Sequence, residues 1–343
     1  MTVRLRPRRA AAALATAAAL LLAACGDDDD PAAGPSSSGA ATSAAADDGT
    51  AGGDGGPVTV TDGSGTEVVL DEPARRVVAL EWTYAEDLLV LGVEPAGVAD
   101  VDGYRGWVAS PVLPADVADV GTRQEPSLER IAALEPDLIV SATFRHDGIR
   151  DQLEAIAPTL LFNPYPDGID HLEEMRTTFS TLAAAVGRDA QAEAVLGDLD
   201  DKIDATAARL EQAGLAGAPV AVAQGALQQG TPVLRLFTAN AMVSALLEEA
   251  GLTAAWSGPE EQYGFNTVDL EGLTALPDDA HLLTIAQSVS DPFTDAFPGN
   301  PVWDNLPVVR AGRVHPMGGD TWTFGGPASA GTFLDRVTTA LTG

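Results

Sequence analysis

The chain has 343 residues, of which 45% are hydrophobic and 20% are charged. It is therefore too long for one ordinary domain and too apolar to be disordered throughout. Its 19 basic residues against 50 acidic ones give a net charge of −31, which argues against a protein that binds the nucleic-acid backbone. A single cysteine excludes a disulfide scaffold and any multi-cysteine zinc or iron–sulfur site.

The N-terminus has the three zones of a secretory signal. Four arginines within residues 4–9 precede the apolar run Ala10–Ala24, which is too short to span a membrane. The run ends in Leu-Ala-Ala-Cys-Gly and looks like a bacterial lipobox. We therefore expect residues 1–24 to be a lipoprotein signal peptide and Cys25 to carry the lipid that anchors the chain to the extracytoplasmic face of the cell membrane. An ordinary signal peptide with a chance cysteine is the alternative.

Residues 25–56 are predicted to form a flexible tether. This stretch is rich in Asp, Gly, Ser, Ala and Pro and contains no aromatic residue, so it cannot bury enough apolar surface to fold.

Residues 57–186 are predicted to form an α/β lobe. An opening β-hairpin, Val58–Thr61 and Thr66–Leu70, turns at Asp62-Gly63. Short β-rich runs then alternate with helical patterns, which indicates a largely parallel sheet. The expected strands are Val77–Leu80, Ala96–Ala99, Val117–Val120, Leu138–Ser141 and Thr159–Phe162, and the expected helices include Ala85–Leu91, Ser127–Leu134 and Gly148–Ile156.

One long helix is predicted over residues 187–213, with Asp189 at its N-cap and Gly214 after its end. Residues 214–343 then repeat the alternation. Strands are expected near Val220–Ala223, Val233–Phe237 and Leu282–Ile285, and helices at Ala241–Ala250, Asp269–Leu276 and Ala328–Leu341. The sequence thus predicts two Rossmann-like α/β lobes joined by one long, rigid connecting helix.

The two halves share a short internal echo. Ser127–Leu134 and Asp269–Leu276 each combine a capping residue, a glutamate in the first turn and a leucine-rich face, and each precedes a strand. The alternative is that any capped helix before a strand has this pattern.

No enzyme motif is present: the chain lacks a Gly-x-Ser-x-Gly elbow, His-Glu-x-x-His, a P-loop and Gly-x-Gly-x-x-Gly. The four histidines, His146, His171, His281 and His315, are scattered without ligand spacing, and His171 is expected on the surface. We therefore expect neither a catalytic residue nor a metal site.

Aromatic and arginine residues are more informative. Six of the nine Trp and Tyr residues fall in segments predicted to be loops: Trp82, Tyr84, Tyr104, Trp107, Tyr263 and Trp322. Arg105, Arg123 and Arg145 recur in similar places, and Arg235 lies in a predicted strand. Because ligands of parallel α/β folds bind at the carboxyl ends of strands, these residues indicate a cleft for a bulky ligand with oxygen acceptors.

Several motifs in order resemble the ferric-hydroxamate-binding proteins of ABC importers, which are class III periplasmic binding proteins. They are Arg-Val-Val-Ala-Leu-Glu-Trp (76–82), Leu-Gly-Val-Glu-Pro-Ala-Gly-Val-Ala-Asp (91–100), Tyr-Arg-Gly-Trp (104–107), Val-Gly-Thr-Arg-Gln-Glu-Pro-Ser-Leu-Glu (120–129), Leu-Pro-Val-Val-Arg-Ala-Gly-Arg (306–313) and Trp-Thr-Phe-Gly-Gly-Pro-Ala-Ser-Ala (322–330). The resemblance covers residues 57–343 and implies two α/β lobes bridged by one helix.

The resemblance also implies roles for single residues. Arg123 matches the arginine that hydrogen-bonds iron-coordinating oxygens, and Trp107 and Trp322 match aromatic walls of the cleft. Tyr263 stands where hydroxamate binders have tryptophan, and Phe324 where they have tyrosine.

Two further pairs follow from the resemblance. Arg145-His146 replaces a tyrosine of the hydroxamate binders and matches the Arg-His of ferric-dicitrate binders, which favours a more anionic chelate. Glu129 and Glu271, the glutamates of the echo, match those that dock on permease arginines, one for each lobe.

The expected function is capture of a ferric siderophore, of hydroxamate or citrate type, by a monomeric, lipid-anchored binding protein without catalysis. It delivers the chelate to an ABC permease and needs no cofactor, because the siderophore coordinates the iron. Three alternatives stay open: a binder of cobalamin or haem, with His146 or Tyr263 as the haem ligand; a surface lipoprotein hydrolase; and a structural adhesion lipoprotein.

Overall fold

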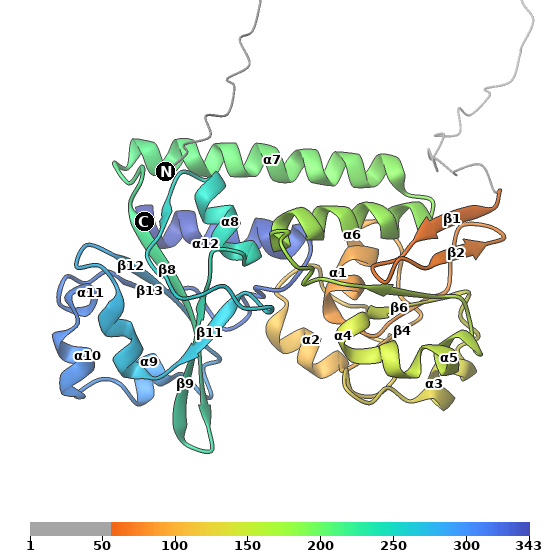
Figure 1. Cartoon of the computed structure of the whole chain (residues 1–343), viewed down its shortest axis with the longest axis horizontal. Coiled ribbons are helices and arrows are strands. Elements are labelled where there is room, and N and C mark those ends of the chain that lie inside the picture. Colours follow the sequence, from red (N-terminus) through yellow and green to blue (C-terminus); the bar gives the residue numbers. More distant parts are fainter. Residues whose placement is uncertain (1–55) are drawn as a thin grey trace, which may run out of the picture. The chain divides into compact units, whose positions relative to one another are not determined.

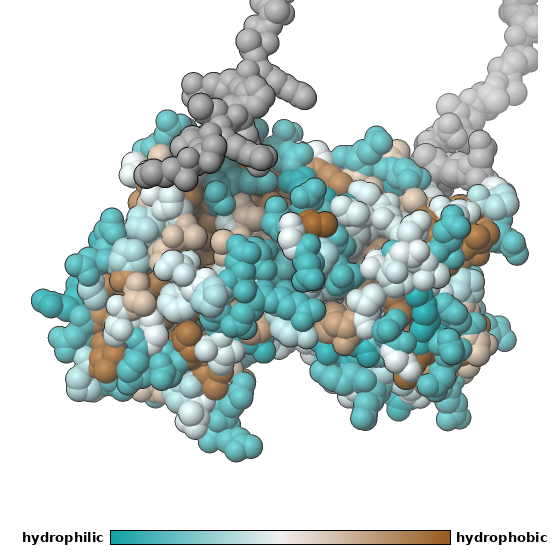
Figure 2. All heavy atoms as spheres, in the orientation of Figure 1, coloured by the Kyte–Doolittle hydropathy of each residue, from teal (hydrophilic) through white to brown (hydrophobic). Residues whose placement is uncertain are grey.

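The computed structural model describes residues 56–343 (Figure 1). The predicted signal peptide, Cys25 and nearly all of the predicted tether lie outside the described residues. Within residues 56–343, no helix is long and apolar enough to cross a membrane. The face drawn in Figure 2 is mostly hydrophilic, and its hydrophobic residues lie scattered or in small groups.

The first half contains a five-stranded parallel sheet of order β5-β4-β3-β6-β7. Its strands are β3 (Val77–Ala79), β4 (Gly97–Val98), β5 (Ala118–Asp119), β6 (Leu138–Ala142) and β7 (Thr159–Phe162). Strands β3, β6 and β7 are continuous runs of buried residues because helices cover both faces of a parallel sheet. Each strand lies within two residues of its predicted bounds.

Of the three helices predicted in this half, one begins three residues earlier than expected and two begin one or two residues later. The helices observed in this half are α1 (Trp82–Val90), α2 (Val101–Trp107), α3 (Leu128–Ala133), α4 (Thr143–His146), η1 (Asp147–Ile149), α5 (Arg150–Glu154) and α6 (His171–Ala185). Helix α1 starts at Trp82, directly after the extended residue Glu81. Trp82 and Tyr84 are therefore helical and buried, and the prediction that they lie in a loop was wrong. Tyr104 and Trp107 likewise belong to α2.

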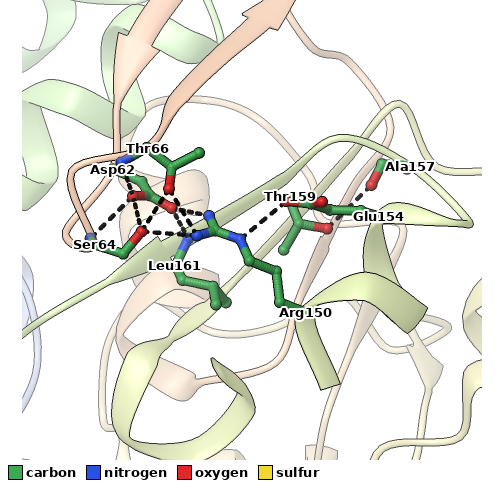
Figure 3. A network of polar contacts seen from close by, with 8 residues as sticks. All are labelled: Asp62, Ser64, Thr66, Arg150, Glu154, Ala157, Thr159 and Leu161. Atoms are coloured by element: carbon green, nitrogen blue, oxygen red, sulfur yellow. Dashed lines mark hydrogen bonds and ion pairs between the residues drawn. The ribbon is translucent and has the colours of Figure 1, made fainter. Parts of the chain in front are cut away.

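The opening hairpin, β1 (Val58–Thr61) and β2 (Glu67–Leu70), is fastened to the sheet by Asp62 (Figure 3). The buried Asp62 carboxylate accepts hydrogen bonds from the N–H groups of Ser64 (2.9 Å) and Leu161 (3.2 Å), and it pairs with Arg150. Burial alone would raise the pKa of Asp62, but these bonds outweigh it and lower the pKa below its ordinary value.

Replacing this carboxylate is expected to weaken the fold. Asp62→Asn leaves the Arg150 charge without its buried partner, and we expect a loss of about 3 kcal/mol in the free energy of unfolding. Because folding lowers the Asp62 pKa, this contribution is complete above the unfolded pKa of about 3.9 and declines as the pH falls through the folded pKa. Denaturant unfolding at pH 7 and pH 3 checks both statements. Asp116→Asn, at an exposed position, is the control, and equal stability of the two variants at pH 7 contradicts the prediction.

The predicted long helix is α7 (Asp189–Gln212), which contacts α6 of the first half and α8 and α12 of the second (Figure 1). Asp189 is its first residue and not its N-cap, which is Arg188. Gly214 follows the helix with a φ of +74°, a conformation that glycine adopts without steric strain.

The second half contains a mixed sheet of order β11-β9-β8-β12-β13, and β10 also pairs with β8. Its strands are β8 (Pro219–Gln228), β9 (Thr231–Phe237), β10 (Thr253–Ala254), β11 (Phe265–Val268), β12 (His281–Ile285) and β13 (Val314–Pro316). Strands β8 and β9 form an antiparallel hairpin around Gln229-Gly230, both with positive φ. The predicted alternation of strands and helices is therefore interrupted here.

The helices of the second half are α8 (Met242–Glu249), η2 (Leu270–Ala275), α9 (Pro292–Asp295), α10 (Pro301–Asn305), α11 (Pro307–Arg310) and α12 (Pro327–Thr342). Hydrogen bonds join this half to the first: Thr83 donates to the Phe324 carbonyl (2.6 Å), and Gln287 to the Gly106 carbonyl (2.9 Å). Such bonds fix the position of segment 322–326 against α1, where the candidate site lies.

Candidate ligand-binding cleft

A cleft lies between the two halves, and its space, including the part open to solvent, is about 700 Å³. Its lining comes from α1, α4, α6, the end of β6 and the loops of the first half, and from residues 237–325 of the second. The residues are Glu81, Thr83, Tyr84, Asp87, Arg123, Ala142, Phe144, Pro164, Tyr165, His171, Glu174, Met175, Thr178, Phe237, Ala241, Met242, Tyr263, Trp322, Thr323, Phe324 and Gly325.

Three lining residues follow the carboxyl ends of parallel strands. Glu81 comes soon after β3, Phe144 soon after β6 and Tyr165 soon after β7. None of the three was predicted from the sequence as a site residue. The rule that located Trp82 would have found them, since ligands of parallel sheets bind at this edge.

A buried carboxylate holds the two predicted cleft arginines together. Glu81 is 5% exposed and pairs with both Arg123 and Arg145. Burial raises the pKa of Glu81, and the attraction of the two guanidiniums opposes that rise. With Glu81 ionised, the three groups together carry one positive charge, so Arg145 does not add a second uncompensated guanidinium to the cleft.

Besides its ion pair with Glu81, Arg123 packs against two tryptophan rings. Its guanidinium carbon lies 4.1 Å from the Trp82 ring centre and 5.5 Å from that of Trp322. Trp322 in turn packs edge-on against Trp107, with ring centres 6.1 Å apart. The Trp322 N–H is buried in the cavity wall and has no acceptor among the described residues.

Aromatic rings from the two halves pack edge-on against each other in the cavity wall. The ring centres of Tyr165 and Phe144, in the first half, lie 5.2 and 6.0 Å from the ring centre of Tyr263, in the second. Tyr263 stays 42% exposed, so it stands at the mouth. Phe324 extends this aromatic wall, since its ring centre lies 5.3 Å from that of Trp322.

Arg235 extends from β9 beside this wall. Its guanidinium lies 4.6 Å from the ring centre of Phe265, and it donates a hydrogen bond to the Gln224 side chain (3.1 Å).

Many of the site residues predicted from the sequence therefore lie at or next to the cavity. Tyr84, Arg123, Tyr263, Trp322 and Phe324 line it directly. Trp82, Trp107, Arg145 and Arg235 do not line it, but each contacts a residue of its wall or of the aromatic cluster that continues from it.

Two expectations about histidines were wrong. His146 was placed in the cleft, but it is 1% exposed and its Nδ1 bonds the Ser141 hydroxyl behind the cavity (2.5 Å). His171, expected on the surface, is 8% exposed and lines the cavity. Burial lowers the pKa of each to about 4, so both are neutral at pH 7. The burial of His146 and His171 depends on contacts with residues distant in the chain, which cannot be predicted from the neighbouring sequence.

The echo residues Glu129 and Glu271 lie at equivalent places in the two halves. Each is exposed in the first turn of a short helix, α3 or η2, whose preceding residue caps it: Ser127 accepts from the Arg130 N–H, and Asp269 from the Gly272 N–H. Each helix precedes the strand that neighbours the central strand of its sheet, β6 beside β3 and β12 beside β8. The second helix is 3₁₀ rather than α.

No group of three or more His, Cys, Asp or Glu side chains suited to holding a metal ion occurs within residues 56–343.

Comparison with known proteins agrees with this architecture. The model of the periplasmic binding protein family matches residues 77–321. The iron(3+)-hydroxamate-binding protein FhuD of Escherichia coli is 32% identical over 269 residues, which cover 78% of this chain and 88% of that protein. The Fe(3+)-citrate-binding protein YfmC of Bacillus subtilis is 30% identical over 282 residues, covering 81% and 84%.

A solved structure is similar in three dimensions. The siderophore-binding protein FhuD from Vibrio cholerae, crystallised with Fe³⁺–Desferal, matches with a TM-score of 0.70 and 29% sequence identity. The match covers 78% of this chain and 97% of that one.

Proposed function

Because this chain belongs to the periplasmic binding protein family, we propose that it captures a ferric siderophore between its lobes for an ABC importer. The observation that carries the proposal is Arg123, held between Glu81 and two tryptophan rings at an aromatic cavity. A guanidinium fixed in this way donates to the negatively charged oxygens that coordinate iron, while the rings pack against the organic shell of the chelate.

The charge of the cleft favours a hydroxamate chelate over a citrate one. Arg145 alone suggested a strongly anionic ligand, but Glu81 offsets one of the two guanidiniums. A cleft with little net charge and many rings suits a chelate of low charge, such as a ferric tris-hydroxamate. Identity to both the hydroxamate-binding and the citrate-binding relative supports the broader siderophore class.

The iron enters and leaves as the chelate in this proposal. The siderophore supplies its ligands, so the protein supplies hydrogen bonds and packing and requires no cofactor. The chain acts as a monomer that binds one chelate, and a lipid on Cys25 keeps it at the extracytoplasmic face of the membrane. Tyr263 is the one of the two candidate haem ligands that lines the cavity, and no observation favours haem or cobalamin.

Tryptophan fluorescence of the full-length protein tests the proposal, because Trp322 lines the cavity and Trp82 and Trp107 pack near it. Ferrioxamine B, ferrichrome and ferric citrate are titrated in parallel, with the iron-free chelators as controls. We expect saturable quenching by a hydroxamate at lower concentration than by ferric citrate. A folded protein that responds to none of the three would overturn the assignment to these ligands.

Docking on the permease is proposed for Glu129 and Glu271, one exposed glutamate in each lobe. Their equivalent places in the two sheets fit a partner with two equivalent subunits.

Substituting these glutamates is expected to separate binding from uptake. In Glu129→Ala and Glu271→Ala, chelate affinity stays within about twofold of wild type, because both side chains are exposed and neither lines the cavity. Iron uptake by cells that depend on this protein falls, and falls further in the double variant. Glu193→Ala, exposed on α7, is the control. Normal uptake by the double variant argues against the docking role.

A further inference from the structure

Helix α12 begins without a side-chain cap from its own segment. Its N-cap residue is Gly326 and its first residue is Pro327, and both are buried. The free N–H groups of a first helical turn need acceptors, above all where water does not reach them, and a helix N-terminus favours a negative charge. The start of α12 therefore requires an acceptor from elsewhere in the fold.

Glu86 of α1, in the other half of the chain, is this acceptor. It is fully buried, and its Oε1 accepts from the N–H groups of Gly326 (3.0 Å) and Ser329 (2.8 Å). Its Oε2 bonds the Ser329 hydroxyl (2.5 Å). Burial raises the pKa of Glu86 to about 7, and these hydrogen bonds oppose the rise. Both oxygens of one carboxyl thus hold a helix start that lies 240 residues further along the chain.

Asp87, the next residue, packs against the same helix start as a neutral group. Burial and the neighbouring Glu86 raise the pKa of Asp87 well above its ordinary value, so Glu86 is the carboxyl that ionises first. A Cβ at Gly326 would overlap the Asp87 Oδ1, and a Cβ at Gly325 would overlap the Ser329 side chain. Glycine at both positions therefore lets α1 and the start of α12 approach this closely.

The segment held in this way carries the aromatic wall of the cleft. Trp322 precedes the start of α12, and its ring centre lies 5.5 Å from the guanidinium carbon of Arg123. Phe324 follows in the same wall, and Thr83, one turn before Glu86 on α1, donates to its carbonyl (2.6 Å). The wall is therefore tied to α1 at two points, and Glu86 is the more deeply buried of the two.

We propose that Glu86 is a positioning residue for chelate binding: by capping α12 from the other half, it sets the place of Trp322 beside Arg123. The inference rests on the proposed function. Glu86 is not among the residues that line the cleft, so it acts through the segment that it holds. An amide in its place has one acceptor oxygen and turns its NH₂ group toward donors, so the start of α12 shifts and moves Trp322 with it.

A double-mutant cycle of Glu86→Gln and Trp322→Ala tests this coupling. Dissociation constants for ferrioxamine B are measured at pH 8 by titration calorimetry of the full-length protein, because calorimetry does not depend on Trp322 fluorescence. We expect Glu86→Gln to weaken binding about tenfold with Trp322 present, and less than about twofold once Trp322 is alanine. Asp62→Asn, which weakens the fold outside the cleft, is the control and should bind as wild type does.

The ligand-free protein provides a second readout. Glu86→Gln should shift the tryptophan emission of the protein that contains Trp322, and by much less in the Trp322→Ala background. Equal shifts in the two backgrounds contradict the proposal.

Two affinity results would also overturn the positioning role. One is wild-type affinity of a folded Glu86→Gln variant, and the other is an equal loss of affinity in both Trp322 backgrounds. Where Glu86→Gln does not fold, Ser329→Ala, which removes one donor and keeps the carboxyl, takes its place in the cycle. If wild type does not bind ferrioxamine B, the proposed function fails for this chelate, and the emission spectra still decide whether Glu86 positions Trp322.

Discussion

Arg123→Ala is expected to weaken binding of a ferric hydroxamate by about 10- to 100-fold. The substitution removes a charge-assisted donor, and such bonds contribute about 1.5–3 kcal/mol. It also leaves the buried Glu81 with Arg145 as its one remaining arginine partner among the described residues. Fluorescence titration of the full-length variant measures the change.

Two further variants show whether the geometry of Arg123 matters as well as its charge. Arg123→Lys keeps the positive charge but cannot form the two-pronged pair, so its loss should lie between wild type and the alanine variant. Arg209→Ala, exposed on α7, should bind as wild type does. An alanine variant with wild-type affinity and a wild-type unfolding curve would remove Arg123 from the site.

Glu81→Gln is expected to change both stability and ligand preference. The variant leaves two guanidiniums without the buried carboxylate between them, and breaking such a pair costs about 3 kcal/mol of unfolding free energy. The cleft then carries one more positive charge, so the affinity for ferric citrate rises relative to ferrioxamine B by about tenfold. Denaturant unfolding and parallel titrations at fixed salt check the two effects.

Glu94→Gln is the matched control, because it removes an exposed carboxylate from the same half of the chain. It should leave stability and ligand preference unchanged. If Glu81→Gln keeps the wild-type ratio of affinities in a folded protein, Glu81 does not set the charge of the cleft.

The arrangement of the first lobe was predictable because its signals are local. Apolar runs such as Leu138–Ser141 indicate buried parallel strands, and a helical pattern of apolar residues predicts α7. The β8–β9 hairpin was less visible, because Gln-Gly is not among the usual Asn-Gly or Asp-Gly turn pairs.

The arginine and tryptophan residues of the site could be predicted from the sequence, but its acidic residues could not. Tryptophan stands out in the sequence because the chain has five, and arginine because basic residues number 19 against 50 acidic ones; Arg123 and Trp322 do lie at the cavity. Acidic residues number 50, so nothing local distinguishes Glu81 or Asp87 from those on the surface. What sets them apart is burial against residues distant in the chain, such as Arg123 for Glu81 and segment 322–326 for Asp87.

The most direct test of the central claim is a crystal structure with bound ferrioxamine B, in which anomalous scattering locates the iron. We expect one iron atom in the interlobe cavity, with the chelate oxygens as its ligands and the Arg123 guanidinium hydrogen-bonded to them. Iron held directly by a protein side chain, or located away from this cavity, would contradict the account.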